Sequence, residues 1–215
     1  MRNAALKLFA TLTFLAMGIT PVFAQQGPPP GGPGGGRPAG PPPGPPLRLS
    51  STSYSDGGTI PDKYTCAGPG GFASMTSPEV SWSNAPAGTQ SFVLLLHDPD
   101  AHARKSVEDI THWIIFNIPG DATSLPEGVK QDAPASVGLQ GNNIMGRPSF
   151  MGPCAPPGPP HHYTLELFAL DTKLDLPAGA SRADIFKAMD GHVLTGTVYI
   201  GLFNRQPGSQ MPRPQ

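Results

Sequence analysis

Two short, dense runs of apolar residues predict the central strands of a sheet. Residues 92–96 (FVLLL) are partly β-branched and lack any polar side chain, a pattern typical of a strand buried on both faces. Pro99 follows closely, and because proline has no backbone N–H to donate to a ladder, we expect the strand to end there. Residues 113–118 (WIIFNI) form the second run, which stops at Pro119.

Three weaker patterns extend this sheet. Residues 163–168 (YTLELF) alternate between apolar and polar side chains, which indicates a strand with one face buried. Residues 197–203 (TVYIGLF) predict a late strand, and residues 47–54 a weaker early one. The chain is therefore expected to be mainly β.

One segment has the pattern of a helix, near residues 182–190. Ser181 is a suitable N-cap, with Asp184 three residues later, and Gly191 marks the end. Helical spacing puts three apolar side chains on one face: Ile185, Ala188 and Met189. The fold class expected from these patterns is mainly β, of the α+β type, with a late helix.

The N-terminus has the order of parts of a secretory signal peptide. Arg2 and Lys7 precede an apolar run over residues 8–19, and small residues lead up to Ala24. The run is shorter than the roughly 20 apolar residues that a membrane span needs. We therefore expect residues 1–24 to be removed and the protein to be periplasmic or secreted, with no membrane span afterwards. The alternative is an uncleaved N-terminal anchor, which N-terminal sequencing would reveal.

Composition divides the remaining chain into three parts. Residues 25–46 are so rich in proline and glycine that they have almost no apolar side chains to bury, which predicts a disordered linker. Residues 47–205 have the length and apolar content of one domain. Residues 206–215 repeat the bias toward Pro, Gly and Gln and are expected to be a disordered tail.

The net charge argues against two classes of partner. The full chain has 14 basic and 15 acidic residues, and cleavage after Ala24 removes two basic ones, which leaves a net charge of −3. Nucleic acids and anionic membrane surfaces both require a basic face. We expect neither as a partner.

The chain has two cysteines, Cys66 and Cys154. In an exported protein, a disulfide between them is the default expectation. It would close a loop of nearly ninety residues, which stabilises the folded state by about 4 kcal/mol in the chain-entropy model. Its second end would hold the segment that precedes His161.

Polar side chains gather at the ends of three predicted strands, in the segments HDPD (97–100), THW (111–113) and HHY (161–163). Imidazole and phenol groups can donate hydrogen bonds to an anion, and a nearby carboxylate favours the protonated imidazole. Tyr163 and His161 are two residues apart, so they project to the same side of a strand. Together these segments predict a site for small anions.

Each residue also has a simpler interpretation when it is considered alone. Asp98 precedes a proline and is typical of a turn. His112 could be a core histidine with a satisfied hydrogen bond, and His162 could be a surface residue. His97, His102 and His192 have no partner that the sequence assigns. The prediction of a site depends on the combination of segments.

That combination resembles a known family. The strings LLLHDPDA, THWIIFNIPG and GPCAPPGPPHHYTLELFALD, together with IPDKYTCAG, SPEVSW and KAMDGHVL, are similar to signature segments of the phosphatidylethanolamine-binding proteins, or Raf kinase inhibitor-like proteins, in their bacterial branch. The resemblance covers residues 49–203. It implies a large, antiparallel-rich central sheet packed on a smaller sheet, and a pocket that accepts phosphate, phosphorylethanolamine or acetate. The pocket residues it implies are Asp98, His112, His161 and Tyr163, with Ala155 and Pro156 on the rim.

Two positions depart from the family pattern. His102 stands where the family often has proline, and Phe150 where this branch often has tyrosine. His102 is expected to alter one wall of the pocket. Phe150 removes any contact that a hydroxyl would make there.

The function expected from these features is binding without chemistry or cofactor. The ligand would be phosphate, a phospholipid head group, or a phosphorylated or carboxylate group of a partner protein, and the resemblance adds modulation of a kinase or protease. Binding through imidazolium would weaken as pH rises through the histidine range. The alternative is a hydrolase that uses His and Asp, or zinc held by histidines, although the chain has no HExxH, CxxC or GxSxG motif.

Overall fold

The computed structural model describes residues 44–209 except residues 74, 104 and 135. The predicted signal peptide, most of the predicted linker and residues 210–215 lie outside these ranges. The described part of the predicted tail, residues 206–209, forms a turn in which the Ser209 N–H donates to the Gln206 carbonyl (3.1 Å). Within the described residues, no helix is both long enough and apolar enough to cross a bilayer.

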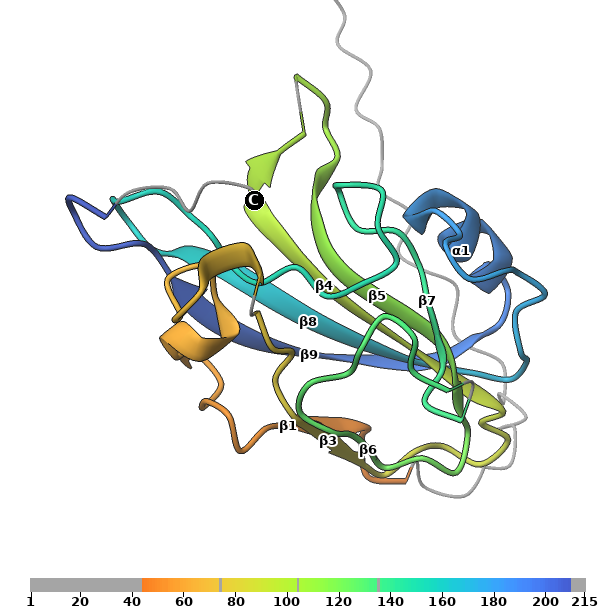
Figure 1. The fold of residues 1–215 in the computed structure, drawn as a ribbon. Coiled ribbons are helices and arrows are strands. Elements are labelled where there is room, and N and C mark those ends of the chain that lie inside the picture. The colour runs from red at the N-terminus through yellow and green to blue at the C-terminus, as the bar shows by residue number, and fades with distance from the viewer. Residues whose placement is uncertain (1–43, 74, 104, 135, 210–215) are drawn as a thin grey trace, which may run out of the picture. The chain divides into compact units, whose positions relative to one another are not determined.

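A six-stranded sheet forms the centre of the domain (Figure 1). All neighbouring strands pair antiparallel except β2 and β9, which pair parallel. The family resemblance predicted this antiparallel-rich sheet. In spatial order the strands are β2 (Gly58–Thr59), β9 (Val193–Phe203), β8 (His161–Leu170), β4 (Ser91–His102), β5 (Asp109–Pro119) and β7 (Leu139–Gln140).

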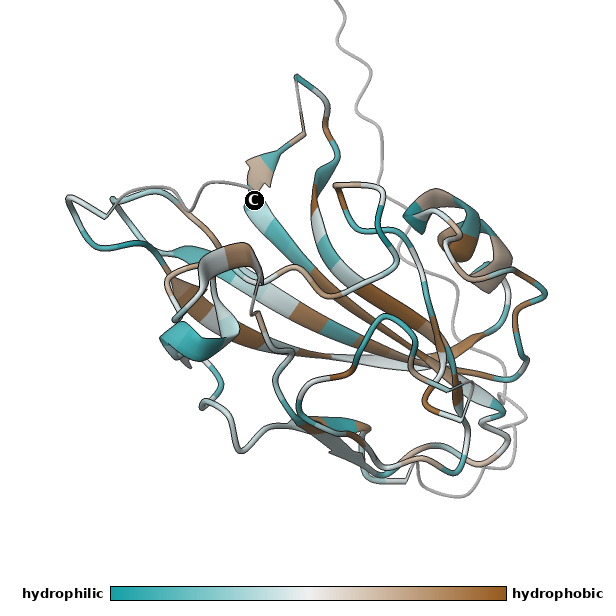
Figure 2. Cartoon of the chain, in the orientation of Figure 1, coloured by the Kyte–Doolittle hydropathy of each residue, from teal (hydrophilic) through white to brown (hydrophobic). Residues whose placement is uncertain are grey.

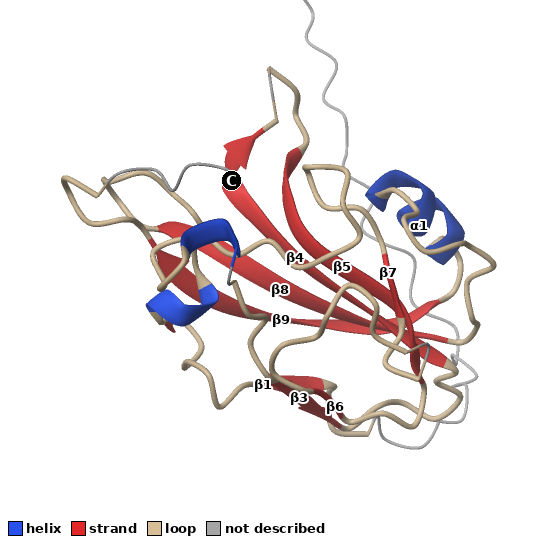
Figure 3. Ribbon diagram, in the orientation of Figure 1, coloured by secondary structure: helices blue, strands red, loops and turns tan. Residues whose placement is uncertain are grey.

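A small antiparallel sheet packs against one face of the large one. It consists of β1 (Arg48–Ser50), β3 (Val80–Ser83) and β6 (Ser124–Leu125). Trp82 of β3 contacts Phe92 of β4, with ring centroids 5.3 Å apart. Figure 3 shows that strands and loops make up most of the domain, with two short 3-10 turns, η1 (Asp62–Tyr64) and η2 (Gly71–Ala73), before β3. The mainly β prediction is confirmed.

The helix α1 (Arg182–Met189) packs on the opposite face of the large sheet. As the sequence predicted, Ser181 is its N-cap, and its hydroxyl accepts the N–H of Asp184 (3.1 Å). Ile185 and Met189 are buried against apolar residues of β4 and β5. Figure 2 shows how apolar residues concentrate along these central strands.

The strand β4 divides its side chains between two cores. Leu94 and Leu96 belong to the core beneath the small sheet, whereas Val93 and Leu95 belong to the core beneath α1. This follows from the two-residue period of a strand. The prediction that residues 92–96 are buried on both faces is confirmed, because none of them is more than 2 % exposed.

The expectation that Pro99 ends this strand is wrong. β4 continues to His102, although the pairing of β4 with β8 ends at His97. On the other side, the register with β5 shifts between Asp98 and His102, so Pro99 falls in the irregular stretch. Proline is tolerated there because no ladder hydrogen bond requires its missing N–H.

Candidate functional site

The four side chains predicted to form the site come from three adjacent strands. Asp98 lies on β4, His112 on β5, and His161 and Tyr163 on β8. Asp98 contacts His161, and the imidazole of His112 contacts the ring of Tyr163. The structure therefore brings together residues up to 65 positions apart in the sequence, on the face of the sheet that carries Leu94 and Leu96.

Asp98 and His161 form a partly buried hydrogen-bonded pair. Nδ1 of His161 lies 2.8 Å from Oδ2 of Asp98, and because a carboxylate only accepts, Nδ1 is the donor. Oδ1 of Asp98 accepts the N–H of Asp100 (3.0 Å), which is the turn contact that its place before a proline suggested. With 2 % exposure, Asp98 is thus both a turn residue and the partner of His161.

A β-bulge sets the direction of His112. Leu96 pairs with Trp113, but the next residue of β4, His97, pairs with Thr111. His112 is therefore the extra residue of a two-against-one bulge. Simple alternation would place His112 and Trp113 on opposite faces. Instead Trp113 lies in the core beneath the small sheet and His112 contacts Tyr163 at the same face, with centroids 5.1 Å apart.

His112 is a neutral, buried imidazole. Its Nδ1 lies 3.0 Å from the carbonyl oxygen of Met151, so Nδ1 carries the proton and Nε2 is the acceptor nitrogen of the neutral ring. Burial lowers the pKa of His112, although the Met151 carbonyl and the Asp98 carboxylate oppose that shift. The simpler interpretation of His112, a core histidine with a satisfied hydrogen bond, therefore describes it well, and it contacts the site too.

Tyr163 connects the strands to the loop that follows residue 151. Its hydroxyl oxygen accepts the backbone N–H groups of Cys154 (3.1 Å) and Ala155 (2.9 Å). Burial and the nearby carboxylate of Asp98 raise the pKa of Tyr163, so the hydroxyl keeps its proton at physiological pH. Both lone pairs of the oxygen are occupied, and the hydroxyl proton is donated to the carboxylate of Asp98.

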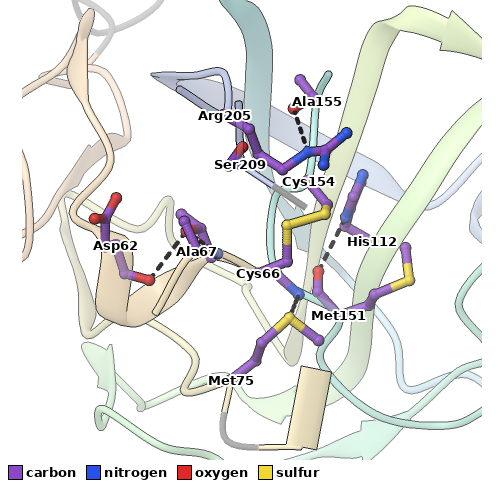
Figure 4. The surroundings of a disulfide bond; sticks show 12 residues. Asp62, Cys66, Ala67, Met75, His112, Met151, Cys154, Ala155, Arg205 and Ser209 are labelled. Atoms are coloured by element: carbon purple, nitrogen blue, oxygen red, sulfur yellow. Dashed lines mark hydrogen bonds between the residues drawn. A yellow bond between two sulfur atoms is a disulfide. The ribbon is translucent and has the colours of Figure 1, made fainter. Parts of the chain in front are cut away.

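The expected disulfide is present and lies directly beside the site (Figure 4). Cys66 and Cys154 are joined with their Cα atoms 5.3 Å apart, and the N–H of Cys66 donates to the Pro153 carbonyl (3.0 Å). Ala155 is buried and Pro156 is exposed, so only Pro156 has the accessibility expected of a rim residue. The disulfide thus attaches the loop to the segment around η1.

The two departures from the family pattern lie in different surroundings. His102 is exposed at the end of β4. Phe150 packs edge-on against Trp113, with ring centroids 5.7 Å apart, and joins the apolar core. Phe150 therefore has a packing role that needs no hydroxyl.

The remaining histidines have carboxylate partners that sequence reasoning did not assign. Nδ1 of His97 lies 2.6 Å from Asp109, on the α1 face, and Nδ1 of His192 lies 2.8 Å from Asp171. His162 is an exposed residue whose Nδ1 lies 2.7 Å from Asp100, as its predicted surface position requires. Among the described residues, no group of three or more His, Cys, Asp or Glu side chains is placed to hold a metal ion.

Two cavities of the domain lie away from the four residues. One, of about 600 Å³, is lined by residues that include Asp109, Thr111 and Arg182 near the start of α1. The other, of about 440 Å³, is lined by residues that include Met75 and Phe150. Neither is lined by Asp98, His112, His161 or Tyr163, so the candidate site is defined by its side-chain contacts.

Comparison with protein families agrees with this architecture. Residues 50–204 match the model of the family described as phosphatidylethanolamine-binding protein. The chain belongs to this family. A UPF0098 protein of Methanothermobacter thermautotrophicus is 42 % identical over 160 residues, which cover 74 % of this chain and 99 % of that protein.

Two solved structures of the phosphatidylethanolamine-binding protein (PEBP) family have the same fold. The homologue CT736 of Chlamydia trachomatis aligns with a TM-score of 0.65 at 31 % identity, over 75 % of this chain and 99 % of that one. Escherichia coli YbcL aligns with a TM-score of 0.66 at 27 % identity, over 74 % and 99 %. The family and the fold predicted from the sequence are confirmed. The roles of the individual site residues stay predictions.

Proposed function

We propose that this PEBP-family protein binds a small anion at Asp98, His112, His161 and Tyr163. The ligand is a phosphate, a phosphorylated head group such as phosphorylethanolamine, or a phosphorylated or carboxylate group of a partner protein. The observation that carries this proposal is the Asp98–His161 pair (2.8 Å) beside the hydroxyl of Tyr163. It places two groups that can donate hydrogen bonds to an anion, His161 and Tyr163 of β8, beside the carboxylate of Asp98 on β4.

The chemistry of each group supports binding. When His161 is protonated, Nδ1 donates to Asp98 and Nε2 is left as a second donor. The Tyr163 hydroxyl hydrogen-bonds to Asp98 and becomes a donor to the ligand when a ligand oxygen replaces that carboxylate as its acceptor, whereas Nε2 of neutral His112 accepts. A partly protonated phosphate offers both acceptor oxygens and an O–H, and therefore suits such a mixed set. Binding of this kind needs no chemical step, and modulation of a kinase or protease would be a consequence of it.

We further propose that the protein acts after export, in the periplasm or outside the cell. The disulfide between Cys66 and Cys154 supports this proposal, because such bonds persist in oxidising compartments. Residues 1–24 have the signal-peptide pattern described above. N-terminal sequencing of the exported protein tests the proposal: a chain that begins after residue 24 is expected, and one that begins at Met1 would contradict cleavage.

Calorimetry with inorganic phosphate and with phosphorylethanolamine tests the binding site. His161→Ala is expected to weaken binding about 10-fold or more, since it removes a charge-assisted donor. His192→Ala is a matched control, because it also removes a histidine 2.8 Å from a carboxylate, but at an exposed position outside the site. Equal affinities for wild type, His161→Ala and His112→Ala would rule out the site.

A further inference from the structure

None of the four site residues offers a bound anion a permanent positive charge. Asp98 carries a negative charge, and any charge on His161 is balanced by that carboxylate at 2.8 Å. His112 is neutral because burial lowers its pKa. Tyr163 contributes a hydroxyl without charge. An anion that binds here therefore needs a cation from elsewhere in the chain.

Arg205 is a buried cation next to the site. It follows the end of β9 by two residues and is only 8 % exposed. Its backbone N–H and its Nε both donate to the carbonyl oxygen of Ala155, at 3.1 and 3.3 Å. The N–H of the same Ala155 donates to the hydroxyl of Tyr163. Arg205 and Tyr163 thus form hydrogen bonds with the carbonyl and the N–H of the same residue, Ala155.

Among the described residues, no Asp or Glu forms an ion pair with the guanidinium of Arg205. The hydrogen bond that this side chain makes there runs from its Nε to the carbonyl oxygen of Ala155. Arg182 differs: it is more exposed and forms an ion pair with Asp109. Burial of a charge without a counter-charge is costly. Figure 4 shows the guanidinium extending past Ala155, toward the side on which the imidazole of His112 lies. An anion at the site would supply the missing counter-charge.

We propose that Arg205 is the fixed cation of the anion site and binds a ligand oxygen through its terminal nitrogens. This inference rests on the proposed function and adds to it a residue and a source of charge. Guanidinium stays protonated throughout the physiological range and matches the geometry of phosphate and carboxylate oxygens. The ligand then lies between Arg205 and the groups of Asp98, His112, His161 and Tyr163.

Substitutions at Arg205 test this role in titrations with inorganic phosphate at pH 7. Arg205→Gln keeps an N–H that can donate to the Ala155 carbonyl but removes the charge, and we expect it to weaken binding at least about 10-fold. Arg205→Lys restores a charge and is expected to recover part of the affinity. Arg48→Gln removes the same charge from an exposed position on β1 and should leave binding unchanged.

The outcomes separate the inference from the proposed function. If wild type binds phosphate and Arg205→Gln binds it equally well, the inference is wrong and the proposed function stands. If Arg205→Gln and Arg205→Lys are equally weak, Arg205 acts by positioning the loop and not by its charge. If wild type binds no phosphate, both are wrong. Repeating the titration at pH 8.5 adds a second readout, because binding through Arg205 persists when the histidines are neutral.

Discussion

The hydroxyl of Tyr163 offers a direct test of how the loop around Ala155 is held in place. Tyr163→Phe removes one oxygen and keeps the ring that contacts His112. The N–H groups of Cys154 and Ala155 then lose their common acceptor, at 3.1 and 2.9 Å. Ala155 is 4 % exposed, so water cannot easily replace that acceptor.

The size of the stability loss depends on how deeply these two N–H groups are buried. A buried N–H left without an acceptor costs about 1–3 kcal/mol. Cys154 is only partly buried, so water can satisfy much of its loss. We therefore expect Tyr163→Phe to lower the free energy of unfolding by about 2 kcal/mol.

Urea denaturation, followed by fluorescence, measures this loss as a shift of the midpoint at constant slope. Tyr64→Phe is a suitable control, because its hydroxyl donates to Glu127, whose side chain is 44 % exposed. This hydrogen bond is partly buried, but water reaches the Glu127 carboxylate and can replace the lost hydroxyl, so we expect a loss of about 1 kcal/mol. The reasoning fails if Tyr163→Phe costs no more than Tyr64→Phe.

Three further predictions concern pH, the disulfide and the helix cap. Burial lowers the pKa of His112, so as pH falls the unfolded chain binds a proton at this residue before the folded chain does. The free energy of unfolding should therefore decrease as pH drops below about 6.5. Urea titrations at several pH values should show a shallower decrease for His112→Gln than for wild type. Reduction of the Cys66–Cys154 bond, which spans 88 residues, should lower the free energy of unfolding by about 4 kcal/mol in the chain-entropy model; an unchanged urea midpoint would contradict this. Ser181→Ala removes the acceptor of the Asp184 N–H and should cost about 1 kcal/mol, seen as a melting temperature lower by about 2–4 °C, whereas Ser209→Ala on an exposed turn should change little.

Local patterns were sufficient to predict the long elements of this fold. The apolar run at residues 92–96 identified β4 because its side chains are buried on both faces, and the N-cap at Ser181 identified α1 because its hydroxyl bonds to the helix backbone. The pattern at residues 47–54 predicted a strand where β1 lies, but the small sheet as a whole was expected only from the family resemblance. Its strands are two to four residues long, which is too short for periodicity to distinguish them from loops.

The proximity of the candidate site residues was predictable from the sequence, but their protonation states were not. Spacing along β8 correctly put His161 and Tyr163 on one face. Whether an imidazole is charged depends on burial and on hydrogen-bond partners that are distant in the sequence. Met151, which fixes the tautomer of His112, is 39 residues away from it. The neutrality of His112 therefore emerges only from the structure.

The bulge at His112 has a consequence for ligand binding. The bulge turns His112 toward Tyr163, while Trp113 stays packed in the core. Two consecutive residues of β5 therefore have different roles: His112 contacts the candidate site and Trp113 packs in the core. A neutral acceptor at His112, a carboxylate at Asp98 and a guanidinium at Arg205 then differ in the pH range over which they act. Binding that depends on imidazolium groups should weaken as pH rises through the histidine range, whereas binding held mainly by Arg205 should not. The pH dependence of phosphate affinity thus identifies which cation holds the ligand.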